Sequence, residues 1–186
     1  MQRNMAYMSP PQELIEGPLT TEELAARYRA LCDDPLYSNV PGKIELDVWG
    51  RMVMTPPSYY HGALQGRLVR RLGAALGGEA SVEVPIATPA GLFLADVAWA
   101  SRGFALAHQA DVALRRAPEL CIEVVSASNS VKELTEKRDA YLGAGALEVW
   151  IVYPKSKRCE FYGPNGLLET SAYAVDLTGL FDDQAE

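Results

Sequence analysis

The sequence contains no long hydrophobic run. No stretch of about 18 or more apolar residues occurs, so no segment has the length and composition of a transmembrane helix. Residues 1–17, MQRNMAYMSPPQELIEG, lack the apolar segment of a signal peptide. We therefore expect a protein that has no membrane partner and is cytoplasmic.

Cysteine and positive charge are also scarce. The three cysteines, at positions 32, 121 and 159, form no C-x-x-C pair, which argues against a zinc site and a disulfide framework. The formal charge of −7 argues against non-specific coating of nucleic acid, because that binding comes from neutralised phosphates. It leaves room for a local basic groove. There is no G-x-S-x-G elbow or Walker A loop, and GAG at 143–145 lacks the third glycine of a dinucleotide fingerprint.

What remains is the composition of an ordinary globular domain. The chain has 186 residues, of which 48% are hydrophobic and 22% charged. This length suits one domain with a real core. Residues 1–19 contain three prolines and no sustained periodicity, so we interpret them as an N-terminal arm and residues 20–186 as a single domain.

Periodicity predicts three helices and several paired strands. Strand patterns that pair as hairpins are expected at 43–57, 80–100 and 147–163, with one more strand at 119–127. Helical spacing is expected at 20–31, 58–76 and 129–145, the first with a capping box of Thr20 and Glu23. Residues 101–118 carry mixed signals and are expected to form a loop with about one helical turn. The pattern favours a mixed or antiparallel sheet with helices packed on it.

Three carboxylates in the predicted strands differ in their neighbours. Side chains at i±2 share a face of a strand. Asp96 shares its face with Leu94 and Ala98, and Glu123 lies between Cys121 and Val125. Both acids therefore have apolar neighbours. Glu45 has the polar neighbours Lys43 and Asp47, so it is expected to face solvent.

An ionised side chain in a dry interior is paired, bound to a metal, or left in contact with water. For Asp96 and Glu123, one interpretation is a wet sheet edge. The other is a shared cation, because adjacent strands lie roughly 4.8 Å apart. Magnesium prefers oxygen ligands and takes one or two protein carboxylates. Lys137 follows on the next predicted helix, where it either points to the same pocket or forms an exposed pair with Glu133.

The stretches KIELDVWGRMVMTPPSYYHG, LADVAWA and PELCIEVVSASNSVKELTEKRDAYLGAGALEVWIVYP resemble the Uma2 family of the restriction-endonuclease-like PD-(D/E)xK superfamily. The resemblance covers 43 to about 162, and the third stretch is the most specific. It implies an α/β (α+β) fold with a mixed β-sheet flanked by helices. It also implies a metal-dependent endonuclease that hydrolyses phosphodiester bonds of nucleic acid, with DNA as the expected substrate and a homodimer as the expected assembly.

The resemblance also implies site residues. Asp96 and Glu123 match the family's metal ligands, with the Val124 carbonyl as a third ligand for Mg²⁺ or Mn²⁺. Lys137 matches the family's lysine, which in the wider superfamily stands at the position of Val125. Glu45 matches an acidic residue of an N-terminal motif that completes the site through water. His61 also falls on a motif position, where it either contacts nucleic acid or caps a helix.

The sequence departs from the family pattern at some positions, and it also contains a cluster of arginines. Ala95 replaces a proline that shapes the backbone, and Tyr153 stands where relatives have an aspartate. Arg67, Arg70 and Arg71 form a positive helix face that is predicted to contact the nucleic-acid backbone or to be merely solvated. Two rival functions stay open: a catalytically inactive nuclease fold that binds DNA or serves as a dimeric adaptor, and a regulatory protein that works through its sheet edge.

Overall fold

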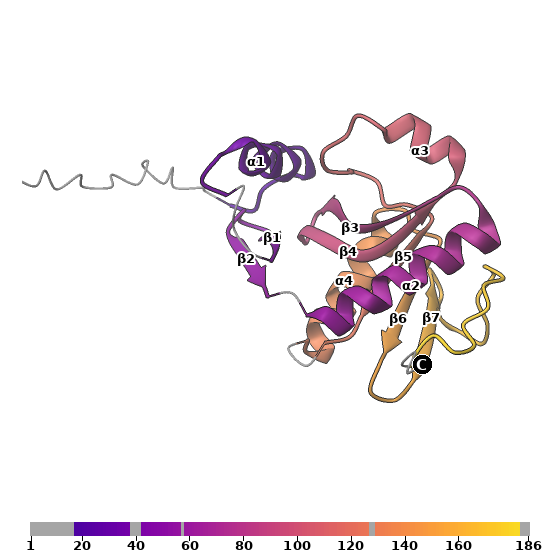
Figure 1. The fold of residues 1–186 in the computed structure, drawn as a ribbon. Helices are drawn as coiled ribbons and strands as arrows, with labels where there is room; N and C mark the ends of the chain where they lie inside the picture. Colours follow the sequence, from indigo (N-terminus) through magenta and orange to yellow (C-terminus); the bar gives the residue numbers. More distant parts are fainter. Residues whose placement is uncertain (1–16, 38–41, 57, 127–128, 183–186) are drawn as a thin grey trace, which may run out of the picture.

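A computed structural model describes residues 17–37, 42–56, 58–126 and 129–182 (Figure 1). The predicted N-terminal arm therefore lies almost wholly outside the described residues. The described residues form four helices and one mixed sheet of eight strands. In chain order the elements are α1 Thr21–Asp33, β1 Lys43–Asp47, β2 Met52–Thr55, α2 Tyr59–Leu76, β3 Glu79–Thr88, β4 Gly91–Ala100, α3 Arg102–His108, β5 Leu120–Val124, α4 Val131–Gly143, β6 Glu148–Tyr153, β7 Arg158–Gly163 and β8 Gly166–Leu168.

Strand β4 organises the sheet. Along one edge it pairs with β3 over nearly its whole length. Along the other edge its first residues pair with β1 and residues 97–99 pair with β5, so residues 93–96 lie between these two pairings. The strand order is β2-β1-β4-β5-β6-β7-β8, and β5 and β6 are parallel. Helix α4 is the crossover that a parallel pair requires.

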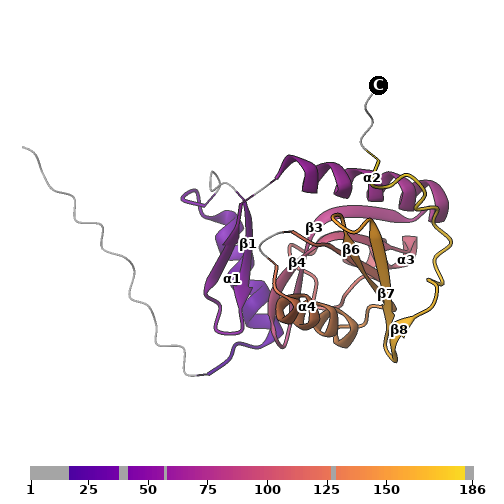
Figure 2. The same cartoon turned by 90° about the horizontal axis from the view of Figure 1, so that it is seen from below.

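The helices bury opposite faces of this sheet. Figure 2 shows α2 on one side of the strands and α4 on the other. Leu64, Leu68 and Leu72 of α2 are fully buried in a core cluster that also contains Trp150. Leu134 and Tyr141 of α4 pack in a second cluster. The apolar stripe of α1 packs in a third, against the start of β4.

Most of the elements expected from periodicity are present, and the region 101–118 differs. Thr20 and Glu23 form the expected capping box of α1, and α2 ends at the predicted glycines with Gly77 as its C-cap. In place of one helical turn, residues 102–108 form α3, whose N-cap Ser101 accepts a hydrogen bond from the Phe104 N–H. Glu119, the residue before β5, accepts a hydrogen bond from the Ser101 hydroxyl (2.6 Å) and so anchors that cap. In the described part of the chain, no helix is both long and apolar enough to cross a membrane.

Candidate active site

Asp96 and Glu123 meet where the sheet opens. The register of β4 and β5 pairs Val97 with Ile122, and its continuation by one step sets Asp96 across from Glu123. Both residues are 3% exposed. The Val124 N–H donates to Asp96 Oδ2 (2.7 Å), and the Tyr141 hydroxyl donates to Glu123 Oε1 (2.8 Å). Each carboxylate is thus held in a fixed orientation by a donor of the scaffold.

Helix α4 and strand β1 complete this part of the site. The crossover lays α4 over β5, and the Lys137 ammonium lies 2.8 Å from Glu45 Oε1 and 3.5 Å from Glu123 Oε2. Glu45 Oε1 also accepts the Leu94 N–H (2.8 Å), one of the β4 donors in the interval between the two pairings. Glu45 therefore lies in the gap between the β1 and β5 pairings of β4. It also holds the buried Lys137 ammonium in position.

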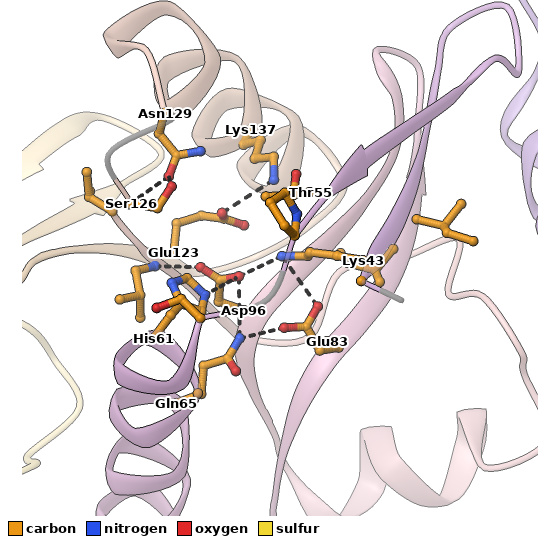
Figure 3. A pocket seen from close by; sticks show the side chains of 18 of the residues that line it. Lys43, Thr55, His61, Gln65, Glu83, Asp96, Glu123, Ser126, Asn129 and Lys137 are labelled. Carbon is orange, nitrogen blue, oxygen red and sulfur yellow. Dashed lines mark hydrogen bonds and ion pairs between the residues drawn. The ribbon is translucent and has the colours of Figure 1, made fainter. Parts of the chain in front are cut away.

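A second group of charges surrounds the other oxygen of Asp96 (Figure 3). Lys43 Nζ lies 2.6 Å and His61 Nε2 lies 3.2 Å from Asp96 Oδ1. Glu83 lies 3.6 Å from Lys43 and accepts a hydrogen bond from Gln65 (2.6 Å). These residues come from β1, α2, β3 and β4. Three elements that are separate in the sequence thus bring side chains to the carboxylate of a fourth.

All the charged side chains of this group except Glu45, together with Gln65, line one large cleft. Its volume is about 1030 Å³, and it runs from the charged group to Tyr28 and Leu31 of α1. A pocket with a few convergent polar groups and perturbed titratable residues is the usual form of an active site.

Neighbouring charges set the protonation states of Asp96 and Lys137. Burial alone raises the pKa of Asp96, but the hydrogen bond with His61 and the charge of Lys43 bring it well below its usual range. Burial alone lowers the pKa of Lys137, but the charges of Glu123 and Glu45 bring it above its usual value. Asp96 is therefore an anion and Lys137 a cation at neutral pH. Lys137 is suited to stabilise negative charge and unsuited to accept a proton.

Glu123 differs from Asp96, because burial raises its pKa to about 7. In metal-free protein the folded state therefore retains a proton that the unfolded state, with a pKa of 4.5, has already lost. This contribution to stability is complete below pH 4.5 and is lost as the pH rises through 7. We expect Glu123→Gln to remove roughly 3 kcal/mol of the fall in unfolding free energy between pH 4.5 and 8, at about 1.4 kcal/mol per pKa unit.

Urea unfolding in EDTA across this pH range measures the effect. Glu136→Gln, on the exposed side of α4, is the matched control and should keep the wild-type pH dependence. If the unfolding free energies of wild type and Glu123→Gln fell equally with pH, that result would contradict the high pKa of Glu123.

The structure brings together Asp96, Glu123, Lys137, Glu45 and His61, while their functional roles stay predictions. The expectation that Glu45 faces solvent is wrong: the residue is 6% exposed, because the polar face of β1 turns toward other charges of the protein. It contacts Lys137 directly, so no water is needed to connect them. The alternative of an exposed Glu133–Lys137 pair is also wrong, because Lys137 is 4% exposed.

The arginine cluster lies outside this group. Arg67 donates to the Leu180 carbonyl, and Arg71 donates to the carbonyls of Asp176 and Thr178. Two of the three arginines thus bind the C-terminal segment to α2, and Arg70 is exposed. Their contact with nucleic acid stays a prediction, as does the role of the Val124 carbonyl as a ligand.

Sequence reasoning missed Lys43, Glu83 and Gln65. The neighbours of Lys43 and Glu83 at i±2 are polar residues or prolines. The neighbours on the same strand face therefore do not indicate that either residue is buried. Gln65 is 7% exposed and follows Leu64 in the buried stripe of α2. A polar residue next to such a stripe was the one available sign.

Comparison with known proteins places this site in a family. Residues 25–180 match a family described as "Uma2: Putative restriction endonuclease". The chain belongs to the Uma2 family. The match includes the whole charged group described above and confirms the resemblance inferred from the motifs. Membership in Uma2 supports the assignment of this protein to the nucleases.

A solved structure has the same fold as this Uma2 chain. It is described as "a putative nuclease belonging to DUF820 from Anabaena variabilis ATCC 29413". The two chains share 17% identity with a TM-score of 0.62, over 88% of this chain and 98% of the other. At this identity the likeness concerns the fold alone, which confirms the predicted restriction-endonuclease-like mixed sheet. No curated protein matches the sequence.

Proposed function

We propose that this protein is a divalent-metal-dependent endonuclease that hydrolyses phosphodiester bonds of DNA. One observation carries the proposal: two buried carboxylates, Asp96 and Glu123, face each other across neighbouring strands, with the Lys137 ammonium 3.5 Å from the second. Metal-assisted phosphodiester hydrolysis uses this combination of oxygen ligands and fixed positive charge.

The residues present fit a divalent cation. Asp96 is ionised, and Glu83 Oε2 is a buried oxygen without a hydrogen-bond partner among the described residues. Asp96 and Glu123 would hold the cation, with the Val124 carbonyl as the expected third ligand. Bound there, the metal would polarise a phosphate oxygen and lower the pKa of a coordinated water. We expect Mg²⁺ or Mn²⁺ in this role.

The protein's own groups supply the remaining chemistry. Glu45 holds the Lys137 ammonium beside the gap between the β1 and β5 pairings of β4. From there the ammonium can donate to an attacking water or to a phosphate oxygen. Tyr141 fixes Glu123 by a hydrogen bond to Oε1, leaving Oε2 directed toward Lys137. Such fixed dipoles and charges stabilise the negative charge that develops in the transition state.

A second function is favoured by the pairing within the site. Lys43 and Lys137 already form ion pairs with all four carboxylates, so the group has countercharges of its own. A nuclease fold that only binds DNA or serves as an adaptor would need no metal. Homodimerisation and a cytoplasmic location belong to both proposals and rest on the sequence and the resemblance alone.

Cleavage assays separate the two functions. Purified protein is incubated with supercoiled plasmid, duplex and single-stranded oligonucleotides and RNA, in Mg²⁺, Mn²⁺ or EDTA. We expect cleavage of DNA that EDTA abolishes and that Glu123→Gln and Lys137→Ala lose. Equal cleavage by the wild type and both variants would indicate a contaminating nuclease, and binding without cleavage would favour the adaptor.

A further inference from the structure

A set of possible metal ligands lies beside the Asp96–Glu123 pair and includes a residue for which the mechanism above has no use. Ligand atoms of His61, Glu83 and Asp96 all lie within 4.8 Å of one another. They come from α2, β3 and β4, and their side chains point to a common centre in Figure 3. One imidazole nitrogen and two carboxylates are a common donor set for a divalent transition metal.

The backbone of Glu83 is unusual for this position. Its φ is 52°, in the left-handed region that a residue with a side chain rarely adopts, although it stands in the interior of β3. The flanking pairs Val82–Val97 and Val84–Ala95 set Glu83 directly across from Asp96. Strained backbone of this kind persists where the surrounding structure imposes it, often at functional sites.

The side chain of Glu83 is also only partly paired. Gln65 donates to Oε1, while Oε2 is buried and has no hydrogen-bond partner among the described residues. The nearest cation is the Lys43 ammonium, 3.6 Å from Oε2. This ion pair is the only contact of that oxygen with a cation among the described residues, while the Glu83 side chain as a whole is 37% exposed.

Lys43 shows that this position accepts a cation. Its ammonium contacts Asp96 Oδ1 at 2.6 Å and lies on the Glu83 side of that carboxylate. The ammonium thus bridges the carboxylates of Asp96 and Glu83. Lysine carries its charge on a flexible four-carbon stem, and the cleft beside it offers room for another position.

We propose that His61, Glu83 and Asp96 bind a divalent cation, and that the Lys43 ammonium occupies this position until the cation displaces it. The proposal deepens the proposed function and rests on its assignment of Asp96 as a metal ligand. Because His61 supplies a nitrogen donor, the site favours Mn²⁺ over Mg²⁺. Glu83 is then a ligand, and Lys43 a competitor whose release leaves an ammonium near the bound substrate.

The test measures Mn²⁺ binding in the absence of nucleic acid, by calorimetry and by the EPR signal of free Mn²⁺. Glu83→Gln should weaken binding by about tenfold or more, as loss of a residue that supports a metal site does. Lys43→Met should tighten it by about tenfold or more, because a unit positive charge a few ångströms away opposes the ion. Both measurements report binding of Mn²⁺ directly and do not depend on cleavage activity.

Two matched controls lie in the same cleft. Glu133→Gln and Lys155→Met each remove one charge from its lining without touching the three ligands, and both should bind Mn²⁺ like wild type. His61→Ala provides an independent variant that should weaken Mn²⁺ more than Mg²⁺. Urea unfolding of each protein establishes that it is folded under the binding conditions.

The outcomes separate this inference from the proposed function. Wild-type protein that binds no Mn²⁺ would overturn both. Binding that Asp96→Asn and Glu123→Gln remove, while Glu83→Gln and Lys43→Met bind like wild type, would overturn the inference and leave the nuclease proposal standing. Weaker binding by Glu83→Gln together with tighter binding by Lys43→Met is the result expected here.

Discussion

Asp96→Asn is expected to reduce metal-dependent DNA cleavage by about a thousandfold or more, since a bound metal supplies several kcal/mol of transition-state stabilisation. The change is nearly isosteric and removes one charge. Asp96 is the point where both halves of the site join: Oδ1 contacts Lys43 and His61, and Oδ2 accepts the Val124 N–H. The asparagine amide has only one oxygen and cannot accept all three contacts. The variant therefore loses both a metal ligand and the negative charge that pairs with Lys43 and His61. Initial rates on supercoiled plasmid at saturating Mn²⁺ measure the loss.

Asp111→Asn is the control for this experiment. Asp111 also contacts a histidine, His108, at 2.8 Å, but it is an exposed residue outside the cleft. It should cleave like wild type. Asp96→Asn is purified in the same way, and urea titration establishes that it is folded. If it then cleaves at the wild-type rate, the reaction takes place elsewhere or belongs to a contaminant.

The test by strand face identified Asp96 and Glu123 because their strands are central. A central strand of a covered sheet exposes neither face to water, so apolar neighbours at i±2 report burial of the acid between them. The helix that follows β5 was likewise predictable from the periodicity of its hydrophobic residues. Which of its polar residues would be buried could not be predicted from the residues alone: Lys137 joins Leu134 and Tyr141 in the buried stripe, where either the pocket or an exposed pair with Glu133 was expected.

The same test failed for Glu45, and the reason is physical. Its neighbours Lys43 and Asp47 are polar, but the Lys43 side of β1 faces the charged group on β4 and α4, and not water. Neighbours in one strand cannot tell a polar interior from solvent, because the distinction depends on what other elements bring. Asp96 and Glu45 lie 51 positions apart, and only the pairing of β1 with β4 brings them near each other.

Glu83 shows a further limit of the sequence. Its role depends on a left-handed backbone conformation inside a strand, which glycine or asparagine would have marked and glutamate does not. The extent of the cleft is another such feature, since its wall combines α1 with α4 and no local pattern relates the two helices.

Lys137→Met is expected to destabilise the protein by about 3–5 kcal/mol, the usual cost of breaking a buried ion pair by removing one partner. Lys137 is 4% exposed, and its loss leaves Glu45, 6% exposed, and Glu123 without their nearest ammonium. The effect is a large part of the total stability of a typical domain. Urea unfolding at pH 8 measures it, and Lys132→Met on the exposed first turn of α4 is the matched control.

Adding Glu45→Gln to Lys137→Met separates structure from catalysis. The glutamine carbonyl still accepts the Leu94 N–H that Glu45 Oε1 now accepts at 2.8 Å, while the charge that Lys137 neutralised is gone. We expect the double variant to recover part of the lost stability, with a coupling energy of about 1–3 kcal/mol between the two sites. Cleavage should stay lost, because no ammonium remains beside Glu123 to stabilise the developing charge. A double variant that regains both stability and cleavage would show that Lys137 serves only to neutralise Glu45, and the catalytic role of the lysine would have to be abandoned.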